Sequence, residues 1–194
     1  MPATSSPWSE PRAWPWPAAC ASAPTPATPD RANFGRVEIA MSAAEIEASV
    51  REQIGRLEAV ALRLGGEIVH VKPHGALYNL AARDGETARP IGRAVLLWNP
   101  RATVFGLAGS PALGLWREVG LPVAAEAFAD RRYEPDGSLR SRAFPDALIT
   151  DAREAAAQAL RFAREGNAQT ICVHGDTPGA VAILTACREA LAAW

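Results

Sequence analysis

The sequence predicts an α/β domain with a mostly parallel sheet flanked by helices, and three observations support this prediction. Short apolar runs alternate along the chain with longer segments whose apolar residues recur at helical spacing. Glycine, proline and acidic residues separate the two kinds of segment. The chain has 194 residues, of which 48% are hydrophobic, and this is enough for one domain with a sizeable core. Strands that alternate with helices are typical of parallel sheets.

The first helix is expected to begin at Ser42, because Ser42-Ala43-Ala44-Glu45 has the pattern of a capping box, and to end at Gly65-Gly66. Further helices are predicted over residues 87–98, 111–119, 152–165 and 178–193, with Asp151 as the cap of the third of these. Strands are predicted over residues 67–71, 103–108, 122–128 and 170–173, with 147–149 as a minor strand or extended piece. Four to five strands are too few to close an eight-stranded barrel.

The N-terminal segment differs in composition from the rest of the chain. Residues 1–29 contain eight of the sixteen prolines and three of the six tryptophans, without a helical or strand period. We therefore expect residues 1–29 to form a disordered or non-homologous arm and residues 30–194 to form the folded domain.

Charge and cysteine content narrow the class of function. The net charge is -1 and the arginines are scattered among acids, which argues against nucleic-acid binding. The three cysteines lack the spacing of a metal site, so a reduced, cytoplasmic protein is expected. No run is long and apolar enough to span a membrane. Small-molecule chemistry is the expected function.

Polar residues gather where two of the predicted strands end. Lys72 and His74-Gly75 follow the first strand, and His174-Gly175-Asp176 follows the last, whereas His70 lies inside a strand and is expected to be structural. Lys72 is the single lysine among twenty basic residues. Its compact amine suits proton transfer or the binding of an anionic substrate. Because loops at the carboxyl ends of parallel strands build the site, we expect one shared rim.

Four segments resemble signatures of the LamB/YcsF family, whose members form the A subunit of 5-oxoprolinase. They are Lys72-Pro73-His74-Gly75-Ala76-Leu77-Tyr78-Asn79, His174-Gly175-Asp176-Thr177-Pro178-Gly179-Ala180, Pro29-Asp30-Arg31 with Phe34-Gly35-Arg36, and Glu126-Ala127-Phe128-Ala129-Asp130-Arg131 with Tyr133. The resemblance covers roughly residues 29 to 190. The family's opening Asp-Leu-Asn-type and Cys-Gly-Phe-His-type segments have no counterpart here, and Thr25-Pro26-Ala27-Thr28 replaces its Gly-Ala-His-Pro segment. We therefore expect the opening strands to be missing and a sheet edge to be exposed.

The resemblance implies an incomplete seven-stranded β/α barrel of the glycoside hydrolase/deacetylase type. It also implies ATP-dependent hydrolysis of the lactam of 5-oxo-L-proline to L-glutamate, carried out with the 5-oxoprolinase subunits B and C, which would share the handling of ATP. The candidate catalytic residues are Lys72 as a cation, His74 or His174 as the base, and Asp176 to orient the base or the water. The candidate substrate-binding residues are Asp30, Arg31, Tyr78, Asn79, Glu126, Asp130 and Arg131.

Two alternatives remain open from the sequence. A metal-dependent, deacetylase-like hydrolase would need about three protein ligands, for which His74, His174 and Asp176 are the candidates. No close pair of histidines supports that site, so the metal content is left unknown. The second alternative is an inactive remnant of the family that lacks its opening strands.

Overall fold

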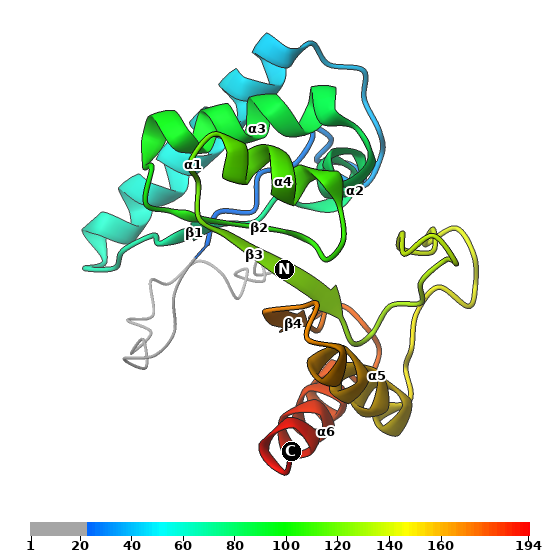
Figure 1. Cartoon of the computed structure of the whole chain (residues 1–194). Coiled ribbons are helices and arrows are strands. Elements are labelled where there is room, and N and C mark those ends of the chain that lie inside the picture. The colour runs from blue at the N-terminus through cyan, green and yellow to red at the C-terminus, as the bar shows by residue number, and fades with distance from the viewer. Residues whose placement is uncertain (1–22) are drawn as a thin grey trace, which may run out of the picture.

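The fold is an α/β half-barrel, seen in a computed structural model that describes residues 23–194 (Figure 1). Its four strands are β1 (His70–Val71), β2 (Thr103–Leu107), β3 (Val123–Phe128) and β4 (Thr170–Cys172). They form one parallel sheet in the order β1-β2-β3-β4, so chain order and spatial order agree. The predicted α/β class and parallel sheet are confirmed. The described residues supply four strands and not the seven of a complete barrel.

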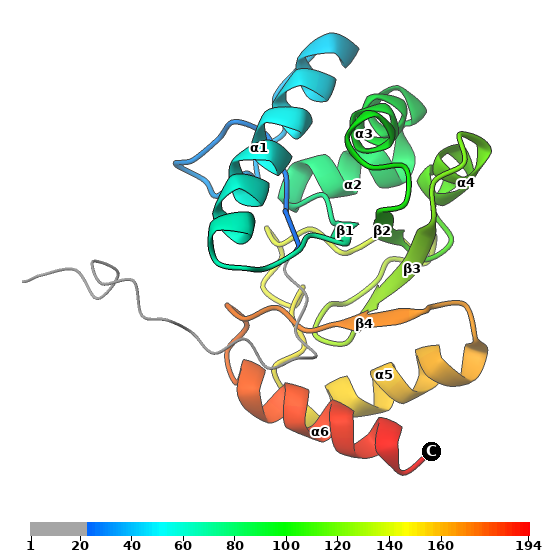
Figure 2. The ribbon, with the colours of Figure 1, turned by 90° about the vertical axis from the view of Figure 1, so that its left-hand side faces the viewer.

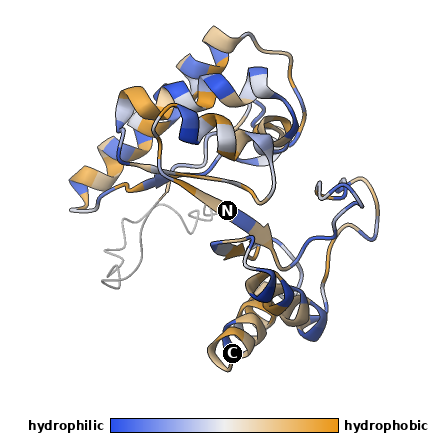
Figure 3. Ribbon diagram, viewed as in Figure 1, coloured by the Kyte–Doolittle hydropathy of each residue, from blue (hydrophilic) through white to orange (hydrophobic). Residues whose placement is uncertain are grey.

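Six helices cover the sheet within the described residues. They are α1 (Ala43–Arg63), α2 (Gly75–Arg83), α3 (Gly85–Trp98), α4 (Pro111–Glu118), α5 (Ala152–Glu165) and α6 (Ala180–Ala192). Helices α1 to α4 lie together against β1, β2 and β3, and α5 and α6 lie side by side next to β4 (Figures 1 and 2). Hydrophobic and hydrophilic residues alternate around the turns of α1 and α3 (Figure 3), as expected of helices that bury one face.

The two faces of the sheet differ because successive strand residues point in opposite directions. Val104 and Ala125 belong to the large apolar cluster under α1 to α4, and Ile171 packs against the cluster formed with α5 and α6. On the other face, Leu107 and Phe128 form only a small cluster with Tyr78, from α2. The inner face of the half-barrel is therefore left for polar side chains.

Most predicted helix ends are confirmed. Ser42 and Glu45 form the complete capping box of α1, and Asp151 caps α5, which ends at Gly166 in the left-handed conformation with φ +68°. Helix α2 was not predicted, because Pro73 and Gly75 indicate a turn. The helix begins directly at Gly75, where the burial of its apolar side chains stabilises a short helix despite its poor start.

The folded domain begins before residue 30, where the sequence analysis placed its boundary. The amides of Lys72 and His74 donate hydrogen bonds to the carbonyls of Pro24 (3.1 Å) and Pro26 (2.9 Å). Residues 24–26 therefore run beside residues 72–74, directly after β1, and pair with the edge of the sheet that was expected to be exposed. Prolines have no N–H, so this pairing uses only their carbonyls. The predicted disorder of residues 1–22 lies outside the described residues.

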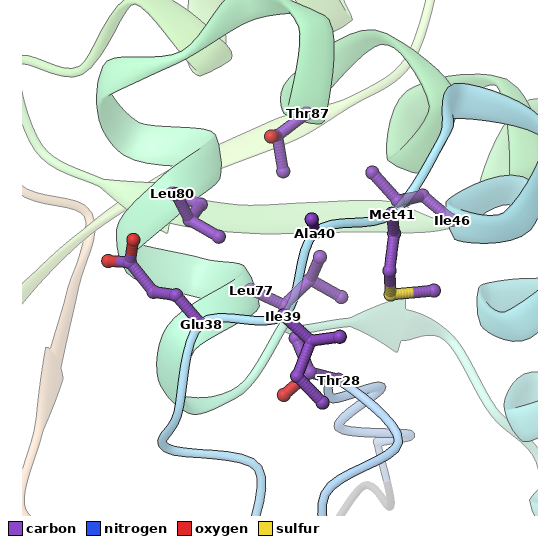
Figure 4. A pocket seen from close by; sticks show the side chains of 9 residues that line it. All are labelled: Thr28, Glu38, Ile39, Ala40, Met41, Ile46, Leu77, Leu80 and Thr87. Atoms are coloured by element: carbon purple, nitrogen blue, oxygen red, sulfur yellow. The ribbon is translucent and has the colours of Figure 1, made fainter.

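A pocket of about 310 Å³ lies away from the polar inner face of the sheet (Figure 4). Residues 38–41 form one wall, and Thr28 with side chains of α1, α2 and α3 forms the rest of the lining. None of the predicted site residues lines this pocket. The candidate site must therefore be built from the strand ends themselves.

Candidate active site

Lys72 lies directly after β1, and its side chain crosses the inner face to reach β3 and β4. Its Nζ donates hydrogen bonds to Glu126 Oε1 at 2.7 Å and to Cys172 Sγ at 3.2 Å. The same atom lies 4.9 Å from the centroid of the Phe128 ring, within the range of a cation–π interaction. The Glu126 side chain is 4% exposed and that of Lys72 is 21% exposed. The single lysine thus joins the ends of three strands through a largely buried ion pair.

The environment of Lys72 favours its charged form. Burial disfavours a charged amine, but the neighbouring Cys172 and Glu126 outweigh burial and raise the pKa of Lys72. Lys72 is therefore a cation at neutral pH and acts as a hydrogen-bond donor. Burial raises the pKa of Cys172 to about 11 although Lys72 opposes this, so the thiol is neutral at pH 7. Of the two interpretations of Lys72, the environment favours the binding of anionic groups over proton abstraction.

Tyr78 and Asn79 both lie on α2, and the centroid of the Tyr78 ring is 6.0 Å from Nζ of Lys72. Within residues 23–194, the buried hydroxyl of Tyr78 and the buried Oε2 of Glu126 have no hydrogen-bond partner. Burial, followed by the charge of Glu126, raises the pKa of Tyr78 well above its ordinary value, so its hydroxyl remains a donor. Asn79 is half-buried, and its side chain makes no hydrogen bond to the described residues. The Tyr78 hydroxyl and the Glu126 carboxylate also act on one another, and a polar ligand or a water molecule between them would give both buried atoms a full partner.

His174 is oriented by Asp130, which follows β3 and is fully buried. The carboxylate of Asp130 accepts hydrogen bonds from Nδ1 of His174 (3.0 Å), from the His174 backbone N–H (3.0 Å) and from the Thr177 hydroxyl (2.5 Å). The imidazole also stacks on Phe128, with centroids 5.1 Å apart and planes inclined by 13°. No hydrogen bond from the described residues engages Nε2 of His174, so this nitrogen is left available for proton transfer.

The state of Asp130 matches this orienting contact. Burial favours the neutral acid, but the hydrogen bonds from His174 and Thr177 outweigh burial and lower the pKa of Asp130. An ionised carboxylate on Nδ1 fixes the tautomer whose Nε2 carries a lone pair, and it stabilises the imidazolium formed when Nε2 takes a proton. Sequence analysis proposed Asp176 for this orienting role, whereas the structure pairs His174 with Asp130.

His74 occupies the N-cap position of α2 and has a different environment. Its Nε2 lies 3.1 Å from the carbonyl oxygen of Phe34, and its ring packs edge-on against the Phe34 ring. A carbonyl only accepts, so Nε2 carries the proton and Nδ1 is the unprotonated nitrogen of the neutral ring. Burial lowers the pKa of His74, and the positive charge of Arg36 lowers it further, although the bond to Phe34 opposes this. His74 is therefore a neutral histidine at the rim.

Two glycines explain why residues 30–36 dock on the start of α2. Gly35 and Gly75 have φ values of +67° and +60°, and a Cβ on Gly75 would lie 2.3 Å from the carbonyl oxygen of Gly35. The Ala76 N–H donates to that same oxygen at 2.9 Å. Asp30 closes this loop, because its Oδ1 accepts from the backbone and side chain of Asn33. The structure thus gives Asp30 a role in shaping the loop.

The surroundings of Arg31 and Asp176 differ from those expected of a substrate-binding residue and of a residue that orients the base. Arg31 is exposed, and its side chain makes no hydrogen bond or ion pair with residues 23–194. Asp176 Oδ2 accepts from Arg36 at 2.5 Å and from Arg142 at 3.3 Å. Burial raises the pKa of Asp176, but the bond from Arg36 and the charge of Arg142 outweigh burial, so the net shift is downward. The structure thus places Asp176 in an ion-pair network.

The sequence matches a known family over the whole of the described part of the chain. The model of the LamB/YcsF family matches residues 21–194. The chain belongs to the LamB/YcsF family. The match begins before residue 29, the expected start of the resemblance, and so includes residues 24–26, which pair with residues 72–74.

Relatives within the LamB/YcsF family have a shared name. A protein from Chloroflexus aggregans that is named as the A subunit of 5-oxoprolinase is 51% identical over 180 residues, covering 87% of this chain and 71% of that protein. A protein of the same name from Shouchella clausii is 48% identical over 169 residues, covering 81% and 67%. The crystal structure of a lactam utilization protein from Thermus thermophilus superposes with a TM-score of 0.78 at 41% identity, covering 87% of this chain and 72% of that one. The likeness confirms the α/β fold.

Several residues at the candidate site were not predicted as site residues. They are Arg36, Phe128, Arg142, Cys172 and Thr177. Four of them lie inside or next to the family motifs, so their place in the motifs was an available signal. Arg142 lies in the long loop between β3 and α5, in a part that matches no motif, and only the fold shows its proximity to Asp176.

The described residues do not support the predicted metal alternative. Within residues 23–194, no group of three or more His, Cys, Asp or Glu side chains is placed to hold a metal ion. His74 contacts Phe34, His174 is held by Asp130, and Asp176 is bound by arginines. These three side chains therefore do not form a metal centre.

No helix of the described part of the chain is both long and apolar enough to cross a membrane.

Proposed function

We propose that this chain is the A subunit of an ATP-dependent 5-oxoprolinase, and that it hydrolyses the lactam of 5-oxo-L-proline to L-glutamate together with subunits B and C. Membership of the LamB/YcsF family and the names of its relatives support this proposal. The observation that carries it is the His174–Asp130 pair, whose imidazole stacks on Phe128, the ring over which the buried cation Lys72 also lies. A base and a cation held against the same ring suit the hydrolysis of an amide.

The chemistry divides between these groups. The lactam is an unactivated amide, so ATP transfers a phosphoryl group to its oxygen and ADP is released. Nε2 of His174 takes a proton from the water that attacks the lactam carbon, and Asp130 stabilises the imidazolium. The imidazolium returns this proton to the lactam nitrogen as the C–N bond breaks, which frees the amine of glutamate and leaves its side-chain carboxyl as an acyl phosphate. A second water hydrolyses the acyl phosphate to the carboxylate and inorganic phosphate. Lys72 stabilises negative charge on the oxygen or on the substrate carboxylate, while Glu126 keeps the amine charged and in place.

The proposal is tested by glutamate release from 5-oxoproline and ATP. The purified chain is assayed alone and in a mixture with subunits B and C from the same source. Turnover is expected in the mixture only. Absence of turnover in the complete mixture would contradict the proposal and favour the inactive alternative.

The role of His174 is tested in the same mixture. His174→Gln is expected to lower kcat by about a hundred-fold or more, because a positioned general base contributes on that order. His70→Gln serves as the matched control, since His70 lies on the same face of the sheet, where it stacks on Phe105. Full turnover by His174→Gln would refute the assignment of the base.

A further inference from the structure

Three arginines converge on one corner of the rim from three separate segments. Arg36 comes from the loop before α1, Arg131 follows β3, and Arg142 belongs to the long loop before α5. Arg36 and Arg142 both donate to Oδ2 of Asp176. Burial, together with the charges of Arg142 and Arg36, lowers the pKa of Arg131 to about 10, so Arg131 remains charged at pH 7.

The corner holds more positive charge and more donors than its protein partners use. Arg36 and Arg142 share the one carboxylate of Asp176, and Arg131 adds a third positive charge next to Asp130, which is already engaged by His174 and Thr177. Each guanidinium has five N–H donors. Within residues 23–194, each of the three makes a single side-chain hydrogen bond, that of Arg131 being to the Arg140 carbonyl at 2.6 Å. Nε of Arg131, in a residue that is 4% exposed, is buried without a partner.

Guanidinium groups with unused N–H donors and excess positive charge suit the binding of a phosphoryl group, because arginine binds phosphate oxygens through paired N–H groups. The corner also adjoins the acid–base residues, because the Phe34 ring lies under Arg36 and packs against His74, and Asp176 is two residues after His174. We propose that Arg36, Arg131 and Arg142 form a binding site for a phosphoryl group. The source of that group rests on the proposed function, in which it belongs to ATP or to the phosphorylated lactam.

The site is tested first without any turnover, by calorimetric titration of the purified full chain with inorganic phosphate at low ionic strength. Arg36→Gln and Arg142→Gln are each expected to weaken phosphate binding by about ten-fold, the loss of one charge-assisted contact. Arg132→Gln is the matched control, because it removes the charge next to Arg131 in sequence but only an exposed ion pair with Glu154. Asp176→Asn is expected to tighten binding, since a competing carboxylate is removed.

The folding of the variants and the identity of the anion are checked in parallel. Thermal unfolding confirms that each variant is folded. If Arg142→Gln does not fold, Arg142→Lys replaces it, because lysine keeps the charge but lacks the planar pair of N–H donors. Equal phosphate affinity in wild type and both arginine variants overturns the site. Arginine-dependent binding of 5-oxoproline without arginine-dependent binding of phosphate or ATP also overturns it, because the anion would then be a carboxylate.

The glutamate assay with subunits B and C separates this site from the proposed function. In one outcome the wild-type mixture turns over, but Arg36→Gln and Arg142→Gln change neither the KM for ATP nor the binding of phosphate. That outcome refutes the phosphoryl site and leaves the proposed function intact. Arginine-dependent phosphate binding without turnover of the complete mixture refutes the proposed function and leaves the site. A rise in the KM for ATP of about ten-fold in both variants supports the two together.

Discussion

Replacing Lys72 by methionine removes the cation from a carboxylate that has almost no access to water. Nζ of Lys72 is 2.7 Å from Oε1 of Glu126, whose side chain is 4% exposed. Removing one partner of a buried ion pair costs about 3–5 kcal/mol, because the remaining charge is left unpaired. The Lys72 side chain is 21% exposed, so some water reaches the pair. We therefore expect Lys72→Met to lower the free energy of unfolding by about 3 kcal/mol, at the low end of that range.

The double variant Lys72→Met/Glu126→Gln separates stability from catalysis. It leaves no unpaired charge, so most of the lost free energy of unfolding should return, as measured by urea denaturation at pH 7. Turnover in the mixture with subunits B and C should not return, because the cation is still absent. Arg56→Met is the control for loss of a cation from an exposed pair, here with Glu52, and should leave stability unchanged within error. Wild-type turnover by the double variant would show that Lys72 serves the fold alone.

Two further predictions follow from the shifted pKa values at the rim. Asp130→Asn should lower kcat by about a hundred-fold or more by releasing Nδ1 of His174. Because the pKa of Asp130 is lowered in the folded state, its carboxylate stabilises the fold above its ordinary pKa of 3.8 and loses this effect as the pH falls through the lowered pKa. Urea denaturation should therefore show that the difference in stability between wild type and Asp130→Asn becomes smaller below about pH 4. A difference that stays constant with pH would contradict this. Cys172, with its pKa raised to about 11, should react slowly with iodoacetamide at about pH 8 and quickly in urea, followed by mass spectrometry of its peptide, whereas equal rates would mean an exposed thiol.

The fold could be predicted where local chemistry determines it. Ser42 and Asp151 accept hydrogen bonds from backbone N–H groups at the starts of α1 and α5, and Gly166 adopts the left-handed conformation that ends a helix, so these boundaries are readable from a few residues. Helix α2 was missed because its start, Pro73 to Gly75, has the composition of a turn, while its stability comes from packing in the large core. The extended residues 24–26 were missed because prolines indicate an irregular segment, although their carbonyls can still accept from a strand edge.

The site could be predicted as a set of residues but not as a set of contacts. The ends of the parallel strands bring Lys72, Glu126 and His174 to one rim, as the alternation of strands and helices indicates. The partner of His174 is Asp130, 44 residues earlier, and Asp176 was the nearer choice along the chain. Which of the two acids pairs with His174 depends on which of them the fold buries. Asp130 has no exposed surface, whereas the side chain of Asp176 is 49% exposed.

The use of the chain's single lysine at this position has a physical explanation in the contacts of Lys72. Its Nζ reaches Glu126 and Cys172 while lying over the Phe128 ring, in a space bounded by residues from β3 and β4. A guanidinium is larger and flatter than an ammonium and presents a fixed fork of donors, which suits Arg36 and Arg142 at the open corner, where they share one carboxylate oxygen. The inner position needs a compact ammonium group that can donate hydrogen bonds in several directions, and the outer position needs guanidinium groups whose paired N–H donors bind an oxyanion. The rim therefore separates a paired inner cation, suited to the reacting amide, from an arginine corner with charge to spare.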